Sequence, residues 1–453
     1  MTQPLRYLVV GVGARAPMFT HALLGTYRDG HQLVALCDNN LTRLEVHHQE
    51  LREKYKIAPL ATGRPQDFAK LIKEQRVDRV IVTSIDRTHH TFICQAMELG
   101  CDVISEKPMT TDAAKCQQVL DTIERTGRKL RVTFNYRYAP RNTLVKELLA
   151  AGTIGKVLSV HFEWLLDTSH GADYFRRWHR DIRNSGGLMV HKATHHFDLV
   201  NWWLDSSPKT VFAQGDLAFY GRENAEERGV SAPYERAHGA PAAKDDRFAL
   251  HLKDYDGLRK KYLEAEHEDG YQRDQNVFGS GISIQDDMSV LVRYRSRATM
   301  SYHLTAYSPW EGFRVMFNGT GGRIEYSDEE SAHVHNAADP RLDRPGATPF
   351  TAGGTRVVVR PLWQKPYEVS VPVSDGGHGG GDERMLDDVF VGAQADPLGR
   401  AANHLDGARS ILTGIAANQS MASGLPVDVD TLVRFPAEAA QTVTAKARRA
   451  TGA

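Results

Sequence analysis

A glycine-rich stretch near the start of the chain has the spacing of a dinucleotide-binding turn. Gly11, Gly13 and Ala16 form a Gly-x-Gly-x-x-Ala pattern, and Asp38 ends the next apolar run. Gly11 permits a tight turn, Gly13 lets the backbone approach a pyrophosphate, and the small Ala16 allows close packing of helix on strand. Asp38 can accept hydrogen bonds from ribose hydroxyls and would repel a 2′-phosphate. The pattern predicts NAD as cofactor in preference to NADP.

A second set of side chains has helical spacing. His191, His195 and Asp198 stand at i, i+4 and i+7, so they share one helix face and can point into one pocket. Such a face can handle protons, although isolated histidines are more often packed core residues. The two histidines also have the spacing of a helical metal pair, but Lys192 stands where a zinc protease needs Glu, and no third ligand is close. We therefore expect no metal site.

The segments around these motifs predict the framework that positions them. Apolar runs at 8–10, 33–37, 80–82 and 102–104 alternate with helix-patterned segments at 17–24, 43–54, 67–75 and up to residue 99. This alternation predicts a parallel, doubly wound α/β sheet. Ligands of such sheets bind at the carboxyl ends of the strands, where segments 83–89 and 105–108 fall.

The second part of the chain has a different pattern. It is rich in β-type runs, which we place at 157–165, 210–218, 289–294, 299–306 and 313–317. The charge-rich segment 220–285, with one expected helix at 258–266, is either an insertion at the site mouth, an oligomer contact or a solvated loop. After it, 376–382 is expected to be a flexible linker, 382–425 helices that pack back on the core, and 438–453 a polar helical tail.

Composition restricts the class of protein. Lys plus Arg equals Asp plus Glu at 56 each in 453 residues, so no global charge favours nucleic acid or an anionic membrane. The four cysteines include no Cys-x-x-Cys pair, which favours reduced thiols. No uncharged apolar run approaches the length of a membrane span, and the first predicted strand leaves no room for a signal peptide. We expect a cytoplasmic protein with a small-molecule substrate, without nucleic-acid or membrane partners.

Several motifs in register resemble one enzyme family. These are Glu106-Lys107-Pro108, Asn135-Tyr136-Arg137-Tyr138, the segment 152–157 (Gly-Thr-Ile-Gly-Lys-Val), and Gly186-Gly187 followed by His195 and Asp198. Their order and spacing resemble the glucose-fructose oxidoreductase / inositol dehydrogenase / MocA (Gfo/Idh/MocA) family over nearly the whole chain. The resemblance implies an N-terminal Rossmann domain (1–130) and an α+β domain (131–453) with a large, mostly antiparallel sheet. It also implies a homodimer or homotetramer.

The resemblance also implies catalytic roles. It places Lys107 beside the nicotinamide, where burial would lower the pKa of its amine, and Pro108 is expected to aim the lysine inward, with a cis bond as one option. His195 matches the family's acid/base histidine. The family pattern has Asp four residues before this histidine, whereas this chain has His191 followed by Lys192. We expect one of these two to take over that role.

The remaining site candidates fall into two groups. The cofactor candidates are Gly11, Gly13, Ala14, Arg15, Ala16, Asp38, Arg43, Thr83, Ser84, Asp86, His89, Glu106, Lys107 and Asn135. The substrate candidates are Arg137, Tyr174, Arg176, Arg177, Trp178, His179 and Asp198. The second group offers hydroxyl-binding donors and an aromatic platform of the kind that a sugar ring requires, although an ordinary charged loop has similar composition.

Three functions remain open at this point. The first choice is an NAD-dependent oxidoreductase that takes hydride from a secondary hydroxyl of a sugar, glycoside or cyclitol. The second is a glycoside hydrolase that uses NAD transiently through a keto-sugar and elimination, because the stretch 377–382 resembles one in NAD-dependent α-N-acetylgalactosaminidases. Those enzymes lack the Glu-Lys-Pro lysine and often have an export signal. The third is a nicotinamide-binding sensor without turnover, which would not need Lys107.

Overall fold

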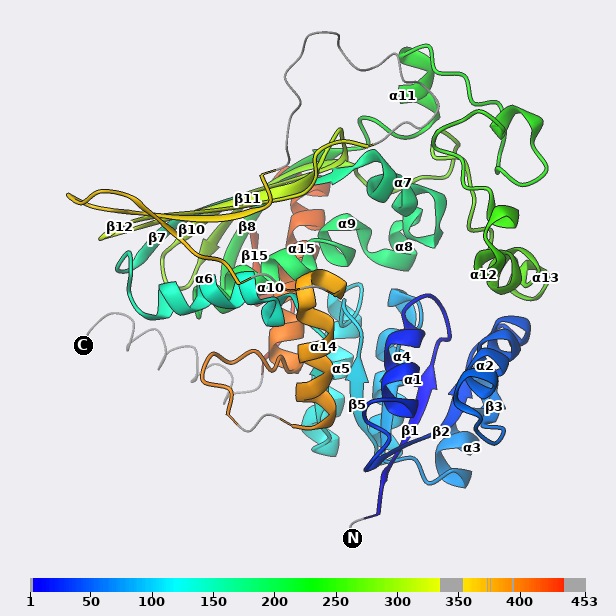
Figure 1. Ribbon diagram of the computed structural model, residues 1–453. Helices are drawn as coiled ribbons and strands as arrows, with labels where there is room; N and C mark the ends of the chain where they lie inside the picture. Colours follow the sequence, from blue (N-terminus) through cyan, green and yellow to red (C-terminus); the bar gives the residue numbers. More distant parts are fainter. Residues whose placement is uncertain (1–2, 335–352, 373, 375, 393–394, 436–453) are drawn as a thin grey trace.

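The chain forms a parallel-sheet domain and a second domain built on a large mixed sheet (Figure 1). The computed structural model describes residues 3–334, 353–372, 374, 376–392 and 395–435. The expected tail helix at 438–453 lies outside these residues. Figure 1 shows the N-terminal domain below the large sheet, with helices of the second domain between them.

The N-terminal sheet has six parallel strands in the order β3-β2-β1-β4-β5-β6. Its strands are β1 (Leu5–Val10), β2 (His31–Cys37), β3 (Ala61–Gly63), β4 (Arg79–Val82), β5 (Asp102–Ser105) and β6 (Leu130–Val132). The helices between them are α1 (Ala16–Leu24), α2 (Leu41–Tyr55), α3 (Phe68–Glu74), α4 (His89–Glu98) and α5 (Ala113–Thr126). This is the doubly wound Rossmann arrangement that the sequence predicts, and its strand order reverses between β1 and β4.

The second sheet has nine strands in the order β14-β13-β12-β11-β7-β10-β9-β8-β15. Its strands are β7 (Val157–Asp167), β8 (Pro208–Asp216), β9 (Asp287–Tyr294), β10 (Thr299–Ser308), β11 (Glu311–Gly319), β12 (Gly322–Ser331), β13 (Thr355–Pro361), β14 (Tyr367–Val369) and β15 (Val427–Asp428). All neighbours pair antiparallel except β7 and β10, which are parallel. The sheet is therefore mostly antiparallel, as predicted.

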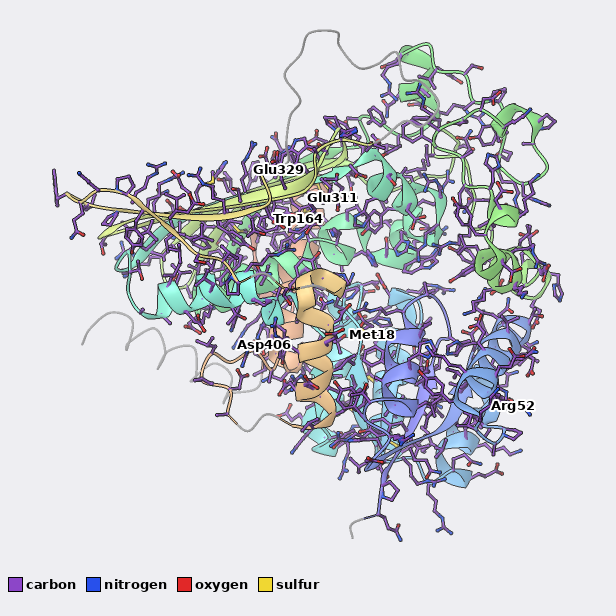
Figure 2. The ribbon with its side chains drawn as sticks, in the orientation of Figure 1. Met18, Arg52, Trp164, Glu311, Glu329 and Asp406 are labelled. Carbon is purple, nitrogen blue, oxygen red and sulfur yellow. The ribbon has the colours of Figure 1, made fainter. Side chains whose placement is uncertain are left out.

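Helices cover the face of this sheet that is turned towards the Rossmann domain. They are α6 (Pro140–Ala150), α7 (Thr168–Arg176), α8 (Ile182–Ser185), α9 (Gly187–His191) and α10 (Thr194–Trp203). The alternating burial of β7 turns Trp164 inward, and Trp164 and Glu311 lie beneath the sheet in Figure 2. Side chains on this inner face of the sheet therefore point towards the Rossmann domain.

Two C-terminal helices connect the Rossmann domain and the second domain. In α14 (Gly377–Phe390), Phe390 packs its ring edge-on against Tyr7 of β1, with ring centroids 5.7 Å apart. The longer α15 (His404–Ser423) is tightly packed at Gly407 and Gly414, where an added Cβ would lie 2.9 Å from Val132 and 2.3 Å from a backbone oxygen of α9. The Ala213 N–H of β8 also donates to the Ser420 hydroxyl of α15 at 2.9 Å, so the C-terminal helices pack on both sheets.

The charge-rich insertion forms short helical pieces on one side of the molecule. These include α11 (Arg222–Glu227), α12 (Asp256–Leu258), a π-helical turn (Arg259–Leu263) and α13 (Glu266–Asp269), together with 3-10 turns at Pro241–Ala243 and Leu252–Asp254. In place of the single helix expected at 258–266, α12 continues directly into the π-helical turn, and α13 follows after two residues. Figure 1 shows α12 and α13 above α2 of the Rossmann domain.

Candidate active site

The glycine turn after β1 has the backbone that a dinucleotide needs. Gly11 has φ +88°, and a Cβ there would lie 2.5 Å from the backbone of Ser84, so glycine is required. An added Cβ at Gly13 meets only the Tyr262 hydroxyl, at 3.9 Å. Gly13 therefore leaves its backbone open to a phosphate, and the turn leads into α1, whose N-terminus favours anions.

Asp38 lies at the end of β2 and is held by its neighbours. Its Oδ2 accepts from the Val12 N–H at 2.7 Å, and its Oδ1 accepts from the Asn40 N–H at 2.9 Å. Burial raises the pKa of the Asp38 carboxyl, and the nearby Arg43 opposes this shift. The carboxylate is thus fixed in place at the edge where the ribose of a dinucleotide binds.

One cavity of about 1290 Å³ joins this turn to the inner face of the second domain. With the exception of Ala16, every cofactor candidate named from the sequence lines it, as do all four catalytic candidates. Among the substrate candidates, Tyr174, Arg177, Trp178 and His179 line it as well. Ala16 is fully buried, in agreement with its expected packing role.

Lys107 is a buried amine in this cavity. The Lys107-Pro108 peptide is cis, and the Lys107 Nζ donates to the His191 carbonyl oxygen at 3.2 Å. Burial lowers the pKa of Lys107 to about 8, with a smaller contribution from Lys192 in the same direction, while Asp86 and Glu106 oppose it. Near neutral pH the amine can therefore exchange a proton.

Asp86 and His191 form a pair across the two domains. The Asp86 Oδ2 lies 2.5 Å from the His191 Nδ1; the Asp86 side chain is buried, and that of His191 is mostly buried. Burial and the charge of Lys107 hold the pKa of His191 well below its ordinary range, so the ring is neutral. Burial raises the pKa of Asp86, and Lys107 and Arg177 oppose that shift. With the Nδ1 proton donated to Asp86, the His191 Nε2 is left as an acceptor.

Lys192 and His195 are both placed by aromatic rings. The Lys192 Nζ lies 4.9 Å from the Trp164 ring centroid, a cation–π distance. The His195 ring stacks on Tyr136 with centroids 4.2 Å apart, and its Nδ1 is buried without a hydrogen-bond partner. Burial, followed by the charge of Lys107, keeps the pKa of His195 well below its ordinary range. His195 is thus a neutral, rigid imidazole at the cavity wall.

The far wall of the cavity includes Glu311, which sequence reasoning missed. Glu311 at the start of β11 accepts from the His170 Nδ1 at 2.7 Å, and the His170 Nε2 is 3.2 Å from the Tyr174 hydroxyl. Other lining residues outside the sequence-based set include Arg141, Glu330, Tyr262, Asp269, Tyr271 and Arg273. They come from segments that are distant in sequence and have no recognisable motif, so no sequence signal pointed to them.

The stretch expected to be a flexible linker is an ordered turn in the cavity wall. His378, Gly379 and Gly380 have φ between +53° and +77°, and His378 and Gly379 line the cavity. Asp382 accepts from the Asn135 Nδ2 at 2.6 Å and pairs with His378 at 2.9 Å. Despite its burial, hydrogen bonds and charges from His378 and Arg15 lower the pKa of Asp382. The linker prediction missed this because a glycine run is compatible with a left-handed turn as well as with flexibility.

Three of the substrate candidates do not line the cavity. Arg137 and Asp198 form a two-pronged ion pair, with the Arg137 Nε 2.7 Å from Asp198 Oδ2 and the Arg137 Nη2 2.5 Å from Asp198 Oδ1, and both are nearly fully buried. Arg176 donates to the Phe248 carbonyl at 2.7 Å. Of the three residues on the predicted face, His191 and His195 line the cavity, whereas Asp198 is buried against Arg137. The chain also breaks between α9 and α10, so the three residues do not lie on one continuous helix.

The chain belongs to the Gfo/Idh/MocA oxidoreductase family. Residues 5–134 match the family's NAD-binding Rossmann fold, and residues 146–429 match its C-terminal alpha/beta domain. The N-terminal domain is therefore an NAD-binding Rossmann domain, which agrees with the open backbone at Gly13 and the fixed carboxylate of Asp38.

Proteins that are similar to this chain in sequence align with different fractions of it. A putative oxidoreductase of Bacillus subtilis, YteT, is 33% identical over 94% of this chain and 98% of its own. D-glucoside 3-dehydrogenase of Escherichia coli is 31% identical, but the match covers 34% of this chain and 42% of the relative. Inositol 2-dehydrogenase of Rubrobacter xylanophilus is 27% identical over 33% and 41%.

Solved structures share the fold at low identity. Aldose-aldose oxidoreductase from Caulobacter crescentus has a TM-score of 0.60 at 16% identity, covering 94% of this chain and 100% of that one. An oxidoreductase from Agrobacterium radiobacter in complex with NAD⁺, L-tartaric acid and magnesium has the same TM-score at 16% identity, covering 95% and 100%. These likenesses concern the fold.

Two features are absent from the part of the chain that the structure describes. Within it, no group of three or more His, Cys, Asp or Glu side chains is arranged to hold a metal ion. Over the same ranges, none of the helices combines the length and the apolar character that crossing a bilayer requires.

Proposed function

We propose that the protein oxidises a secondary hydroxyl of a sugar, glycoside or cyclitol, with NAD, when bound, supplying the hydride acceptor. The observation that supports this most is Lys107, a buried cavity amine whose pKa is lowered to about 8. A neutral amine there can take the hydroxyl proton as the carbon is oxidised. The names of two relatives, a D-glucoside 3-dehydrogenase and an inositol 2-dehydrogenase, support this class of substrate.

The other catalytic candidates complete this proposal. His191 is neutral and oriented by Asp86, so its Nε2 can accept or relay a proton. His195 is also neutral and stacked on Tyr136, and it faces the same cavity. We assign proton removal to Lys107 and relay to the two histidines. Lys192, held over Trp164, is assigned to binding a substrate hydroxyl.

The aromatic wall supports a ring-shaped substrate. The Trp178 and His179 rings stack with centroids 3.6 Å apart, and His179 meets His191 edge-on at 4.3 Å. Burial holds the pKa of His179 well below its ordinary range. Tyr174 and Arg177 supply hydrogen-bond donors on the same wall, so a sugar ring would find an apolar surface and polar edges together.

A panel experiment tests the proposal. Purified protein is incubated with NAD and with sugars, cyclitols and aryl glycosides, and both NADH absorbance and aglycone release are followed. NADH formed in proportion to an oxidised product supports the dehydrogenase. NAD binding without turnover of any compound would instead favour the sensor.

Glycoside cleavage through a transient keto-sugar is the second candidate. It is favoured by the ordered turn at 377–382, which brings His378 to the cavity with its ring centroid 6.5 Å from that of His195. Aglycone released over many turnovers, with no added NAD and no net NADH, would establish this function in place of the first.

The expected cytoplasmic location and the homodimer or homotetramer stay proposals, and light scattering in solution tests the oligomeric state.

A further inference from the structure

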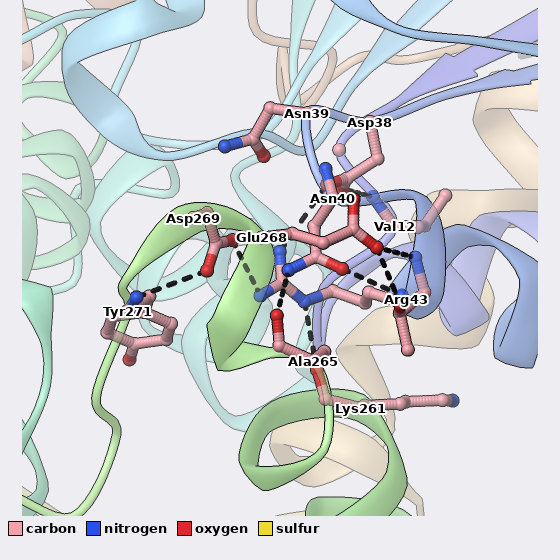
Figure 3. Close-up of polar contacts among 12 residues, drawn as sticks. Val12, Asp38, Asn39, Asn40, Arg43, Lys261, Ala265, Glu268, Asp269 and Tyr271 are labelled. Atoms are coloured by element: carbon pink, nitrogen blue, oxygen red, sulfur yellow. Dashed lines mark hydrogen bonds and ion pairs between the residues drawn. The ribbon is translucent and has the colours of Figure 1, made fainter.

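The insertion is fastened to the Rossmann domain beside Asp38 (Figure 3). The Asn40 Nδ2 donates to the Ala265 carbonyl at 2.8 Å. Glu268 accepts from the backbone N–H groups of Leu41 and Thr42, at 2.9 and 2.6 Å, which are the first residues of α2. These contacts hold α13 at the end of the cavity where the adenosine ribose of a dinucleotide would lie, because β2 ends there.

The contacts between the insertion and the Rossmann domain surround one arginine, Arg43. The Arg43 Nη2 pairs with Asp269 Oδ2 at 3.0 Å, its Nε donates to the Lys261 carbonyl at 3.1 Å, and its Nη1 lies 3.4 Å from Asp38 Oδ1. The Tyr262 ring centroid is 5.3 Å from the Arg43 Cζ, and Arg43 is 7% exposed. The Arg43 guanidinium, which faces this end of the cavity, is therefore already engaged by two carboxylates and a backbone carbonyl (Figure 3).

The position of Arg43 gives this arrangement a consequence for cofactor choice. In Rossmann domains an arginine near the end of the second strand accommodates the 2′-phosphate of NADP, whereas an acidic residue binds the ribose hydroxyl of NAD. This chain has both an arginine and an acid there. Because Asp38 and Asp269 both face Arg43, the three charges sum to a net negative one, which opposes a phosphate.

We propose that Asp269 is a second determinant of the preference for NAD, acting by holding Arg43 away from a 2′-phosphate. Asp269 is a positioning residue in this proposal, and Arg43 is the group through which it acts. The proposal depends on the NAD-binding Rossmann domain and not on the substrate. Absence of sugar oxidation would therefore leave the proposal standing.

Binding titrations of the full-length protein test this role. We expect Asp269→Asn to bind NADP about tenfold more tightly, the scale of one hydrogen bond to a charged group, with little change for NAD. The gain is expected to vanish in the double variant Asp269→Asn/Arg43→Gln, since the phosphate would have lost its partner. Glu266→Gln is the matched control, because Glu266 lies on the same short helix and pairs with Arg236 of the insertion, at 2.8 Å.

The outcomes separate cofactor choice from simple anchoring. An unchanged ratio of NAD to NADP dissociation constants in Asp269→Asn would overturn the proposal, as would a gain that persists without Arg43. The variant Asp269→Ser gives an independent check if Asp269→Asn does not fold, because it also removes the carboxylate that pairs with Arg43. It should likewise bind NADP more tightly, and an unchanged ratio of the two dissociation constants in Asp269→Ser would overturn the proposal.

Discussion

Asp86 and His191 join the two domains through a contact of 2.5 Å between a carboxylate oxygen and an imidazole nitrogen. Asp86 follows β4 of the Rossmann domain, and His191 ends α9 of the second domain. The family pattern noted in the sequence has an Asp where this chain has His191. The site therefore still contains a carboxylate, but the Rossmann domain supplies it: Asp86 lines the cavity and contacts His191 there.

The first prediction concerns this pair. If His191 relays a proton, His191→Asn should lower the maximal rate on the true substrate by about a hundredfold, the usual scale of general acid–base catalysis. Asp86→Asn should produce a similar loss, and the double variant should lose little more than either single one, since both act as one unit. Steady-state kinetics on all three variants measure this coupling.

The control for this pair is His161→Asn, on β7, where the ring contacts Ser301 and does not line the cavity. NAD affinity should be retained in His191→Asn, because the glycine turn is on the other domain. Additive losses in the double variant would show that Asp86 and His191 act separately.

The second prediction is the pH dependence set by Lys107. The amine accepts a proton only when it is neutral, so the rate should rise with pH through about 8, the pKa to which burial lowers this group. Lys192 lowers this pKa and Asp86 raises it. The rising limb should therefore move to higher pH in Lys192→Met and to lower pH in Asp86→Asn. Values of kcat/KM measured from pH 6 to 10 give both shifts, because this range extends about two pH units to each side of the expected limb.

Removal of the amine gives the reference for these profiles. Lys107→Met should abolish the limb and reduce the rate by about a hundredfold or more. Lys115→Met is its matched control, because Lys115 lies on α5 and pairs with Asp112 outside the cavity. Near-full activity of Lys107→Met on the true substrate would remove Lys107 from the proposed mechanism.

The third prediction treats Arg137 and Asp198 as structural. Breaking a buried ion pair typically costs about 3–5 kcal/mol of unfolding free energy when one charge is left uncompensated. Arg137 keeps a longer contact with Asp406, at 3.4 Å, so we expect a cost near the lower end of this range, about 3 kcal/mol. Asp198→Ala should therefore unfold at clearly lower denaturant concentration, with NAD affinity retained by the folded fraction. Destabilisation of less than about 1 kcal/mol together with a raised KM would instead return Asp198 to the substrate site.

The sequence predicts the elements better than it predicts which side chains meet. The Rossmann strands and the β runs at 157–165 and 299–306 were found because apolar periodicity follows directly from burial. Asp198 was misplaced because its partner, Arg137, lies 61 positions away in the sequence, and because the break between α9 and α10 interrupts the helical spacing counted from His191. Such a break has no strong sequence signal.

The insertion shows a different limit. Four residues of its segment 261–273 line the cavity: Tyr262, Asp269, Tyr271 and Arg273. The segment has no apolar periodicity, and Ala265 and Asp269 contact residues more than two hundred positions away. Loop contacts of this kind depend on the whole tertiary structure. The glycine fingerprint, in contrast, was readable because its chemistry depends on local backbone geometry alone.

The last prediction concerns the glycine turn that places His378. Gly379 has φ +64° and lines the cavity, and Gly127, at the end of α5, has φ +66° with open space around it. At either position, an alanine in this left-handed backbone conformation costs about 1–2 kcal/mol of folding free energy. Gly379→Ala and Gly127→Ala should therefore lower the unfolding free energy to a similar extent. The rate should fall only in Gly379→Ala, where the strain is relieved by moving His378 or Arg141. Equal rates in the two variants, at equal stability, would show that the turn closes the cavity without taking part in its chemistry.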